Sequence, residues 1–105
     1  MDTQLKKGLL DFCVLKCLSI EDSYGYKIIN DLSKYIEASE STLYPVLRRL
    51  EEQTLVTTYK EEHSGRLRKY YSITENGKKR LDQFKIETEH LKKVYDYILG
   101  GMDNE

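Results

Sequence analysis

Side chains able to contact DNA are concentrated in the middle of the chain, first along a helical segment and then along a basic hairpin. The segment carries Ser39, Ser41, Thr42, Tyr44, Pro45, Arg48 and Arg49, and the hairpin carries Arg66, Arg68 and Lys69. Short hydroxyls and guanidinium groups hydrogen-bond to base edges, and arginine and lysine contact phosphates. These residue types therefore indicate contact with a duplex, whereas the alternative for the helical segment alone is an ordinary solvated face.

Helical periodicity predicts which face of this segment is buried. At roughly 100° per residue, four apolar residues fall within a sector of about 100°: Leu43, Val46, Leu47 and Leu50. Ser41, Pro45 and Arg48 point the opposite way, with Tyr44 and Arg49 at the margins. We therefore expect a polar face that is free to meet DNA.

The charge of the chain is unevenly distributed. The formal net charge is -1 and the pI about 6.1, values that by themselves argue against a nucleic-acid binder. Residues 1–39 carry 5 basic and 6 acidic side chains, residues 40–80 carry 9 and 6, and residues 81–105 carry 3 and 6. The basic excess thus coincides with the candidate residues, and a positive strip of this kind suits phosphate contact.

The two cysteines, Cys13 and Cys17, lie four residues apart on one face of an apolar helical segment. We expect buried thiols that act as small hydrophobes; the alternative is a redox pair, for which only Lys16 supplies nearby positive charge. His63 and His90 lie far from both in the sequence, and no CxxC or HxxxH spacing is present. The sequence therefore predicts no metal site and no cofactor.

Other classes of protein are disfavoured by missing features. No serine, cysteine or carboxylate has a histidine at a catalytic motif spacing, and there is no glycine-rich phosphate loop, so we do not expect an enzyme. Asp11 and Lys16 interrupt the apolar stretch that follows Lys6 and Lys7, which argues against a signal peptide. No run approaches the roughly 20 apolar residues of a membrane span. We expect a cytoplasmic protein without membrane contact.

The remaining pattern predicts two helices before the candidate segment and a hairpin after it. The helices are expected at residues 5–18 and 24–34, and the strands at residues 56–62 and 68–73. The strands are rich in Val, Thr and Tyr and flank a polar turn that contains a glycine. Ser39 or Ser41 is expected to cap the third helix. If Ser39 is the cap, Pro45 falls in the second turn and should distort it.

The last helix is expected to be long and to carry an apolar stripe. It begins after a Thr74 cap and runs to about residue 99, roughly 37 Å at 1.5 Å per residue. Apolar residues recur along it at spacings of three and four, the pattern of a helix that pairs with another: Leu81, Phe84, Thr88, Leu91, Tyr95 and Ile98. Because the first helix is also apolar almost all round, we expect a homodimer in which this stripe meets Leu5, Leu9 and Phe12. The alternative is packing on the chain's own first helix.

Together these elements predict an α+β fold that is mostly α, namely a winged helix-turn-helix with a C-terminal dimerisation helix. The DNA-binding domain is expected at residues 1–74, sharing its first helix with the dimer interface, and the dimerisation helix at residues 75–105. An alternative function of the same fold is protein contact without DNA binding. That function would need neither an outward Arg48 and Arg49 nor a basic hairpin.

Three motifs resemble the successive signatures of PadR-type transcriptional regulators. They are SYGYKII at residues 23–29, SESTLYPVLRRLE at residues 39–51 and GRLRKYYSITENG at residues 65–77. The resemblance covers nearly the whole chain, and the single short C-terminal helix is similar to that of the compact subfamily. It implies a homodimeric repressor that binds a palindromic operator and responds to a small hydrophobic effector or another stress signal.

The resemblance also implies roles for particular residues. Thr42 and Tyr44 match the duplex-facing residues of the family's third helix. Tyr24 and Tyr26 match a motif that lies near the DNA backbone; the alternative for both is core packing with the hydroxyl reaching solvent, and for Tyr26 the two are equally favoured. The chain departs from the family pattern at Glu40, whose carboxylate would oppose phosphates and must point away from the duplex. It also lacks tryptophan, and so the flat indole platform that some relatives place at the dimer interface.

Overall fold

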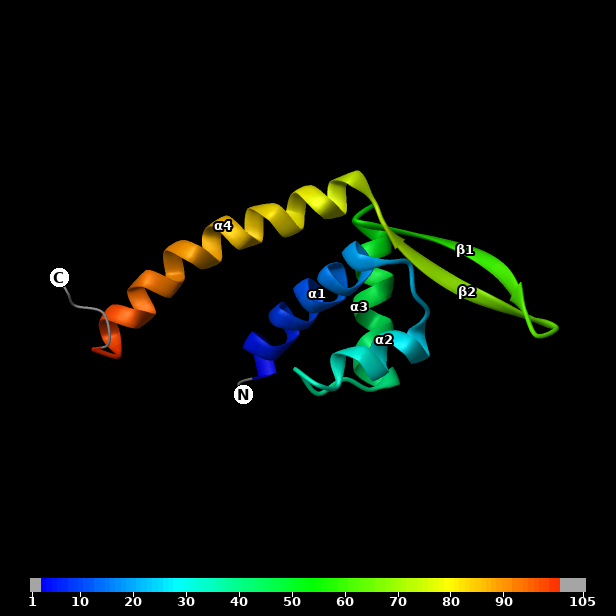
Figure 1. Ribbon diagram of the computed structural model, residues 1–105, viewed down its shortest axis with the longest axis horizontal. Coiled ribbons are helices and arrows are strands. Elements are labelled where there is room, and N and C mark those ends of the chain that lie inside the picture. Colours follow the sequence, from blue (N-terminus) through cyan, green and yellow to red (C-terminus); the bar gives the residue numbers. More distant parts are fainter. Residues whose placement is uncertain (1–2, 101–105) are drawn as a thin grey trace.

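The computed structural model describes residues 3–100 and shows a small helical body with two projections. In chain order the elements are α1 (Thr3–Ile20), α2 (Gly25–Leu32), α3 (Glu40–Glu52), β1 (Val56–His63), β2 (Arg66–Ile73) and α4 (Glu75–Ile98). The hairpin of β1 and β2 extends from one end of the body, and α4 passes over α1 and runs out beyond the other end (Figure 1). The molecule is therefore elongated, with extents of 60 × 26 × 21 Å. The predicted fold class is confirmed, with element ends that differ by one or two residues.

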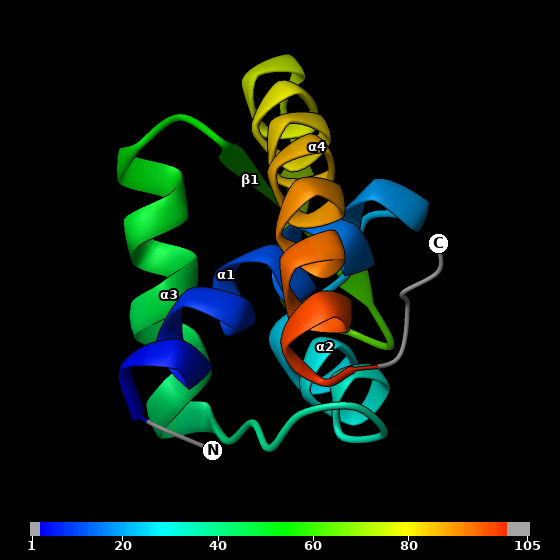
Figure 2. The same cartoon turned by 90° about the vertical axis from the view of Figure 1, so that its left-hand side faces the viewer.

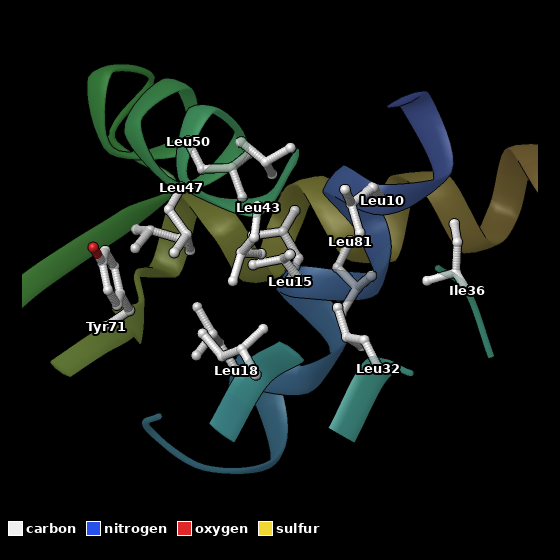
Figure 3. Packing of buried hydrophobic residues seen from close by; sticks show 14 residues of the cluster. Leu10, Leu15, Leu18, Leu32, Ile36, Leu43, Leu47, Leu50, Tyr71 and Leu81 are labelled. Atoms are coloured by element: carbon white, nitrogen blue, oxygen red, sulfur yellow. The ribbon is translucent and has the colours of Figure 1, made fainter. Parts of the chain in front are cut away.

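The core draws apolar side chains from every element (Figure 3). It contains Leu10, Val14, Leu15, Leu18, Ile28, Leu32, Ile36, Leu43, Val46, Leu47, Leu50, Val56, Tyr71 and Leu81. The four predicted core residues of α3 expose no more than 4% of their surface. The buried face predicted for the third helix is therefore confirmed, and it leaves the polar face of α3 outside.

Helix α3 begins at the Ser39 cap and contains Pro45 in its second turn. The Ser39 N–H donates to Oγ1 of Thr42 at 2.9 Å, which satisfies one of the backbone donors at the helix start. Proline removes the donor that the Ser41 carbonyl would use. The helix nevertheless continues through Pro45 to Glu52, and both Ser41 and Pro45 lie on its exposed side.

The hairpin, hereafter the wing, is antiparallel and closed by a two-residue turn. Ser64 and Gly65 both have positive φ, 52° and 80°, the arrangement whose twist matches that of flanking strands. Alternation along β2 sends Tyr71 into the core and Tyr70 to the other face. Ser23, between α1 and α2, pairs with β2 as a single antiparallel bridge: its N–H donates to the Tyr71 carbonyl at 3.1 Å, and its carbonyl accepts from the Tyr71 N–H at 2.7 Å. The base of the wing is thus fixed to the body.

Hydrogen bonds at the base of the wing join the end of α3 to the start of α4. Thr54, two residues after the end of α3, has a positive φ of 60°, a conformation that strains a β-branched residue. The Leu55 N–H then donates to the Leu50 carbonyl at 2.9 Å. Thr74 caps α4 by accepting from the Gly77 N–H at 3.0 Å, and its hydroxyl donates to the Thr54 carbonyl at 2.7 Å. These bonds set the direction in which α4 leaves the wing.

The apolar stripe of α4 divides into two parts. Leu81 is only 6% exposed and belongs to the chain's own core, which leaves little of its surface for the partner contact that the sequence suggested. Phe84 stacks on Phe12 of α1 with ring centroids 3.8 Å apart, so these two predicted interface residues are engaged within the chain. Figure 2 shows α4 on the far side of α1 from α3. Farther along α4, Thr88, Leu91, Tyr95 and Ile98 are exposed.

Candidate nucleic-acid interface

The outer face of α3 gathers the polar residues that the sequence singled out. Five of them are exposed side by side along the helix start and middle: Ser39, Ser41, Thr42, Pro45 and Arg48. Glu40, in the first turn, is exposed as well and is favourably placed for the helix dipole. The structure therefore brings short hydroxyls and one guanidinium to a single surface, as base and phosphate contacts require.

The hydroxyl of Thr42 is partly used by the fold. It accepts from the Ser39 N–H at 2.9 Å and donates to the Ser39 carbonyl at 3.1 Å. These bonds hold the start of α3, so Thr42 supports the helix whose outer face it shares. A contact of Thr42 with DNA would use its methyl group and the remaining hydrogen-bonding capacity of the hydroxyl.

Tyr44 lies at the margin of this face and leans on α2. A Cβ atom at Gly25 would overlap the Tyr44 hydroxyl and lie 2.8 Å from its Cζ atom, so glycine is what allows the close approach. Burial raises the pKa of the Tyr44 phenol, while the positive charge of Lys69 opposes that rise. Tyr44 is 39% exposed, and it therefore presents part of its ring outward between the first turn of α2 and the wing.

The two adjacent arginines of α3 have different surroundings. Arg49 forms an ion pair with Asp11 of α1, with Nη2 and Oδ1 2.5 Å apart. Arg48 is exposed, and within residues 3–100 it forms no ion pair. Arg48 is thus available to a phosphate, whereas Arg49 connects α3 to α1.

The cations of β2 are divided between the two faces of the wing. Arg66 and Arg68 share a face with Tyr70, and the Arg68 guanidinium lies 4.0 Å from the centroid of the Tyr24 ring. Lys69 lies on the opposite face, 5.5 Å from the ring of Tyr71. The basic hairpin that the sequence suggested therefore carries two positive surfaces, one beside Tyr24 at the start of α2 and one beside Tyr44.

Lys60 is a basic residue of the wing that sequence reasoning missed. The register pairs it directly with Lys69, so the two lysine side chains leave neighbouring positions on the same face of the wing. Like charges opposite each other destabilise a hairpin, and an anion would relieve that repulsion. The signal was present in the sequence, since a two-residue turn at Ser64 and Gly65 fixes which residues pair.

The tyrosines at the start of α2 also differ from each other. Tyr24, the N-cap residue, is half-buried and contacts the ring of Tyr70 edge-on, with centroids 5.6 Å apart. Tyr26 is 74% exposed, so the alternative that it packs in the core is wrong. Both residues thus border the polar surface, with Tyr24 held in place and Tyr26 free.

Elsewhere the structure offers no other evident chemistry. Cys13 and Cys17 are free and half-buried, and burial raises the pKa of both thiols, which keeps them protonated at neutral pH. In the described part of the chain no group of His, Cys, Asp or Glu is placed to hold a metal ion. None of the helices within residues 3–100 has the length and hydropathy needed to cross a membrane.

Comparison with known proteins identifies the type of protein to which this surface belongs. Residues 14–83 match the model of the transcriptional regulator PadR-like family. A PadR-like transcriptional regulator of Bacillus cereus strain ATCC 14579 is similar in structure, with a TM-score of 0.84 and 33% identity over 95% of this chain and all of that one. A PadR family regulator of Clostridium difficile R20291 has a TM-score of 0.80 and 34% identity, covering 86% of this chain and 97% of that one.

One curated relative is longer than this chain. The transcriptional regulator YqjI of Escherichia coli K12 is 31% identical over 82% of this chain, and the match covers 42% of the length of that protein. The family match covers α2, α3 and the wing in full, the elements that carry the polar surface described above. The chain therefore belongs to the PadR-like family and is a DNA-binding transcriptional regulator.

Proposed function

We propose that the protein is a homodimeric repressor that presents two copies of the α3 face to a palindromic operator. The observation that carries this proposal is the bare outer half of α4. Four apolar residues along one side of this half are exposed by 44% to 67%: Leu91, Val94, Tyr95 and Ile98. Contiguous apolar surface of this kind on a soluble protein marks an interaction site.

The surface that suits this half of α4 is a groove of about 640 Å³ on α1 of a second copy. Its lining includes Leu9, Cys13, Cys17 and Ile20, with Phe12 and Phe84 stacked at its edge. An isologous pair of such contacts closes a twofold dimer. Leu5 and Leu9 of one chain would then meet the exposed α4 residues of the other. The small hydrophobic effector implied by the family resemblance would find apolar volume in the same groove and would act on assembly.

In this dimer each α3 enters a major groove through its outer face, and each wing contacts phosphates or the adjacent minor groove. Two recognition helices related by a twofold axis reach successive grooves about 34 Å apart, so the half-sites should be separated by roughly one turn. Ser41, Arg48 and the ring of Tyr44 supply the contacts of α3. Arg66, Lys69 and Lys60 supply those of the wing, which depend little on sequence.

The deciding experiment is footprinting of the protein on its own promoter together with sedimentation of the bound complex. We expect two protected half-sites about one helical turn apart, two chains per site, and higher expression of a reporter when the gene is deleted. A single asymmetric half-site or one chain per site would contradict the dimeric arrangement. DNA binding without steep dependence on salt would favour the alternative of a protein-contact module.

The wing is tested separately by Arg66→Ala. Loss of a phosphate contact should weaken binding to operator and random duplex by similar factors and flatten the plot of log K against log salt by about one unit per lost contact. Leu67→Ala, also exposed at the wing tip but uncharged, is the matched control. An unchanged slope and affinity for Arg66→Ala would remove the wing from the binding surface.

A further inference from the structure

An aromatic cluster joins the wing to the segment between α1 and α2. Tyr59 of β1 and Tyr70 of β2 pair across the hairpin, and their rings stack with centroids 5.4 Å apart and planes 8° apart. The hydroxyl of Tyr59 donates to Oδ2 of Asp22 at 2.7 Å. We call Asp22, Tyr59 and Tyr70 the wing brace.

The brace spans the full width of the hairpin. Ser23 pairs with β2 through its backbone, so β2 lies between that segment and β1. Tyr59 therefore passes over the ring of Tyr70 to reach Asp22, and it connects the outer strand to the body. A two-stranded hairpin is only marginally stable by itself. Residues 60–67 of the wing are all exposed, so its direction depends on the contacts at its base.

The brace lies next to the cations on one face of the wing. Arg68, two residues before Tyr70 in the chain, lies on the same face, with its guanidinium 4.0 Å from the ring centroid of Tyr24. Tyr24 itself contacts Tyr70 edge-on. Arg66 lies one step farther out on that face. A tilt of the hairpin at the rung of Tyr59 and Tyr70 would therefore move both guanidinium groups relative to α3.

We propose that the hydrogen bond from Tyr59 to Asp22 is a positioning contact for DNA binding, which holds the wing at the angle where Arg66 and Arg68 meet phosphates while α3 occupies the groove. The inference rests on the proposed contact between wing and DNA. Simple electrostatics makes the opposite prediction for Asp22, because removing a carboxylate near a polyanion should strengthen binding. The brace thus predicts a loss of affinity where charge alone predicts a gain.

Tyr59→Phe is the most direct test, because it removes one hydroxyl, keeps the stacked ring and changes no charge. Binding to a fluorescein-labelled random duplex of about 30 base pairs, long enough for two successive major grooves, would be measured by anisotropy at several salt concentrations. We expect Tyr59→Phe and Asp22→Ala to weaken binding several-fold and Asp22→Asn, which keeps an acceptor oxygen, to stay near the wild type. Tyr35→Phe is the matched control, since that tyrosine is 80% exposed and lies outside the wing.

A double-mutant cycle separates positioning from direct contact. If Tyr59 acts through the cations of the wing, the loss caused by Tyr59→Phe should shrink when Arg66→Ala is already present. Equal losses in both backgrounds would mean that Tyr59 contacts DNA itself and would overturn the brace. Full affinity of Tyr59→Phe, or tighter binding of Asp22→Ala, would overturn it as well. If Arg66→Ala bound DNA as tightly as the wild type, the wing contact would be overturned, and the brace with it.

The hydrogen bond can be observed in solution without DNA. Donation to Asp22 raises the pKa of the Tyr59 phenol to about 12. In an ultraviolet titration, Asp22→Ala should therefore shift part of the tyrosine ionisation to lower pH than in the wild type, as the pKa of Tyr59 returns toward the ordinary range. Identical titration curves would show that the bond is absent. Far-ultraviolet circular dichroism of each variant confirms that it is folded before affinities are compared.

Discussion

Helices α3 and α4 are both amphipathic, but the chain covers only one of their apolar stripes. In α3 the stripe is completely enclosed, and the exposed face carries hydroxyls and Arg48. Among the described residues of α4 only Gly77 and Leu81 are buried, and the outer half exposes Leu91, Val94, Tyr95 and Ile98. The side chains on the exposed face of each helix thus indicate the kind of partner that it binds: polar groups suit a polyanion, and apolar groups suit another protein surface.

The cause of the difference is length. Helix α3 lies wholly within the body and is packed by α1, α2 and the base of β1. Helix α4 has 24 residues, about 36 Å, and it leaves the body after Phe84 has stacked on Phe12. No part of the described chain lies beyond that point to cover it (Figure 1).

Leu91→Asp should break the proposed dimer and have the largest effect. The charge would be buried without a partner in the dimer, at a cost of several kcal/mol, but would stay in water in the monomer. We expect a folded monomer in sedimentation equilibrium where the wild type is a dimer. Lys92→Asp introduces the same side chain at the neighbouring position on another face and should remain dimeric. A Leu91→Asp variant that stays a folded dimer contradicts the role given to α4.

Leu47→Ala should act on the fold instead of on assembly. Leu47 has no exposed surface, and truncation of a buried leucine costs about 2–5 kcal/mol. The decrease in the urea midpoint should be the same at every protein concentration. Leu91→Ala, in contrast, should alter the midpoint chiefly through the concentration dependence of the dimer. A loss below about 1 kcal/mol for Leu47→Ala would mean that the α3 stripe is not a rigid part of the core.

Gly25→Ala should disturb α3 from the side of α2. The added methyl would overlap the hydroxyl end of the Tyr44 ring, so the ring must move away from α2. DNA affinity should fall as well because Tyr44 is displaced. Gly8→Ala in α1 is the matched control: nothing lies within 4 Å of its added Cβ, so it should stabilise the helix by about 0.5–1 kcal/mol. Equal changes in thermal stability for the two variants would contradict the close contact at Tyr44.

Arg48→Ala and Arg49→Ala should separate DNA contact from stability on the same helix. Arg49→Ala loses the ion pair with half-buried Asp11 and should lower the free energy of unfolding by about 1 kcal/mol after solvent screening. Arg48→Ala should leave stability unchanged and weaken DNA binding with a smaller salt slope. Denaturation and anisotropy on both variants measure the two effects, and the reverse assignment would show that Arg49 is the phosphate contact.

The smallest expected effect is on the alkylation rate of Cys13 and Cys17, which line the groove on α1. Because burial raises the pKa of Cys13 and Cys17 above the ordinary 9.0, alkylation by iodoacetamide at pH 7.5 should be slower than that of a free thiol. The stability that depends on these protonated thiols is present below pH 9.0 and is lost as the pH rises through the raised values. A dimer that covers the groove should slow alkylation further. Equal rates in wild type and Leu91→Asp would place the interface elsewhere.

Periodicity and turn chemistry made much of the fold predictable. Leucine and valine spacing identified the buried face of α3, and the stretch of Val, Thr and Tyr around a glycine identified the wing. The polar residues of α3 could be assigned to its outer face for the same reason, since a helical residue's direction follows from its position.

Tertiary structure alone decided how these elements meet. The pairs Arg49 with Asp11 and Tyr59 with Asp22 join residues 38 and 37 positions apart, and no local pattern specifies them. The apolar stripe of α4 was evident in the sequence, but its division at Phe84 depends on the contact that this residue makes with Phe12 of α1. Local propensity and periodicity depend on neighbours along the chain, whereas ion pairs, ring stacking and burial depend on which surfaces the folded backbone brings within a few ångströms. Local residue order was therefore enough to predict the helices, the wing and the polar face of α3, whereas folding sets which cations stay unpaired and which apolar surface is left for a partner.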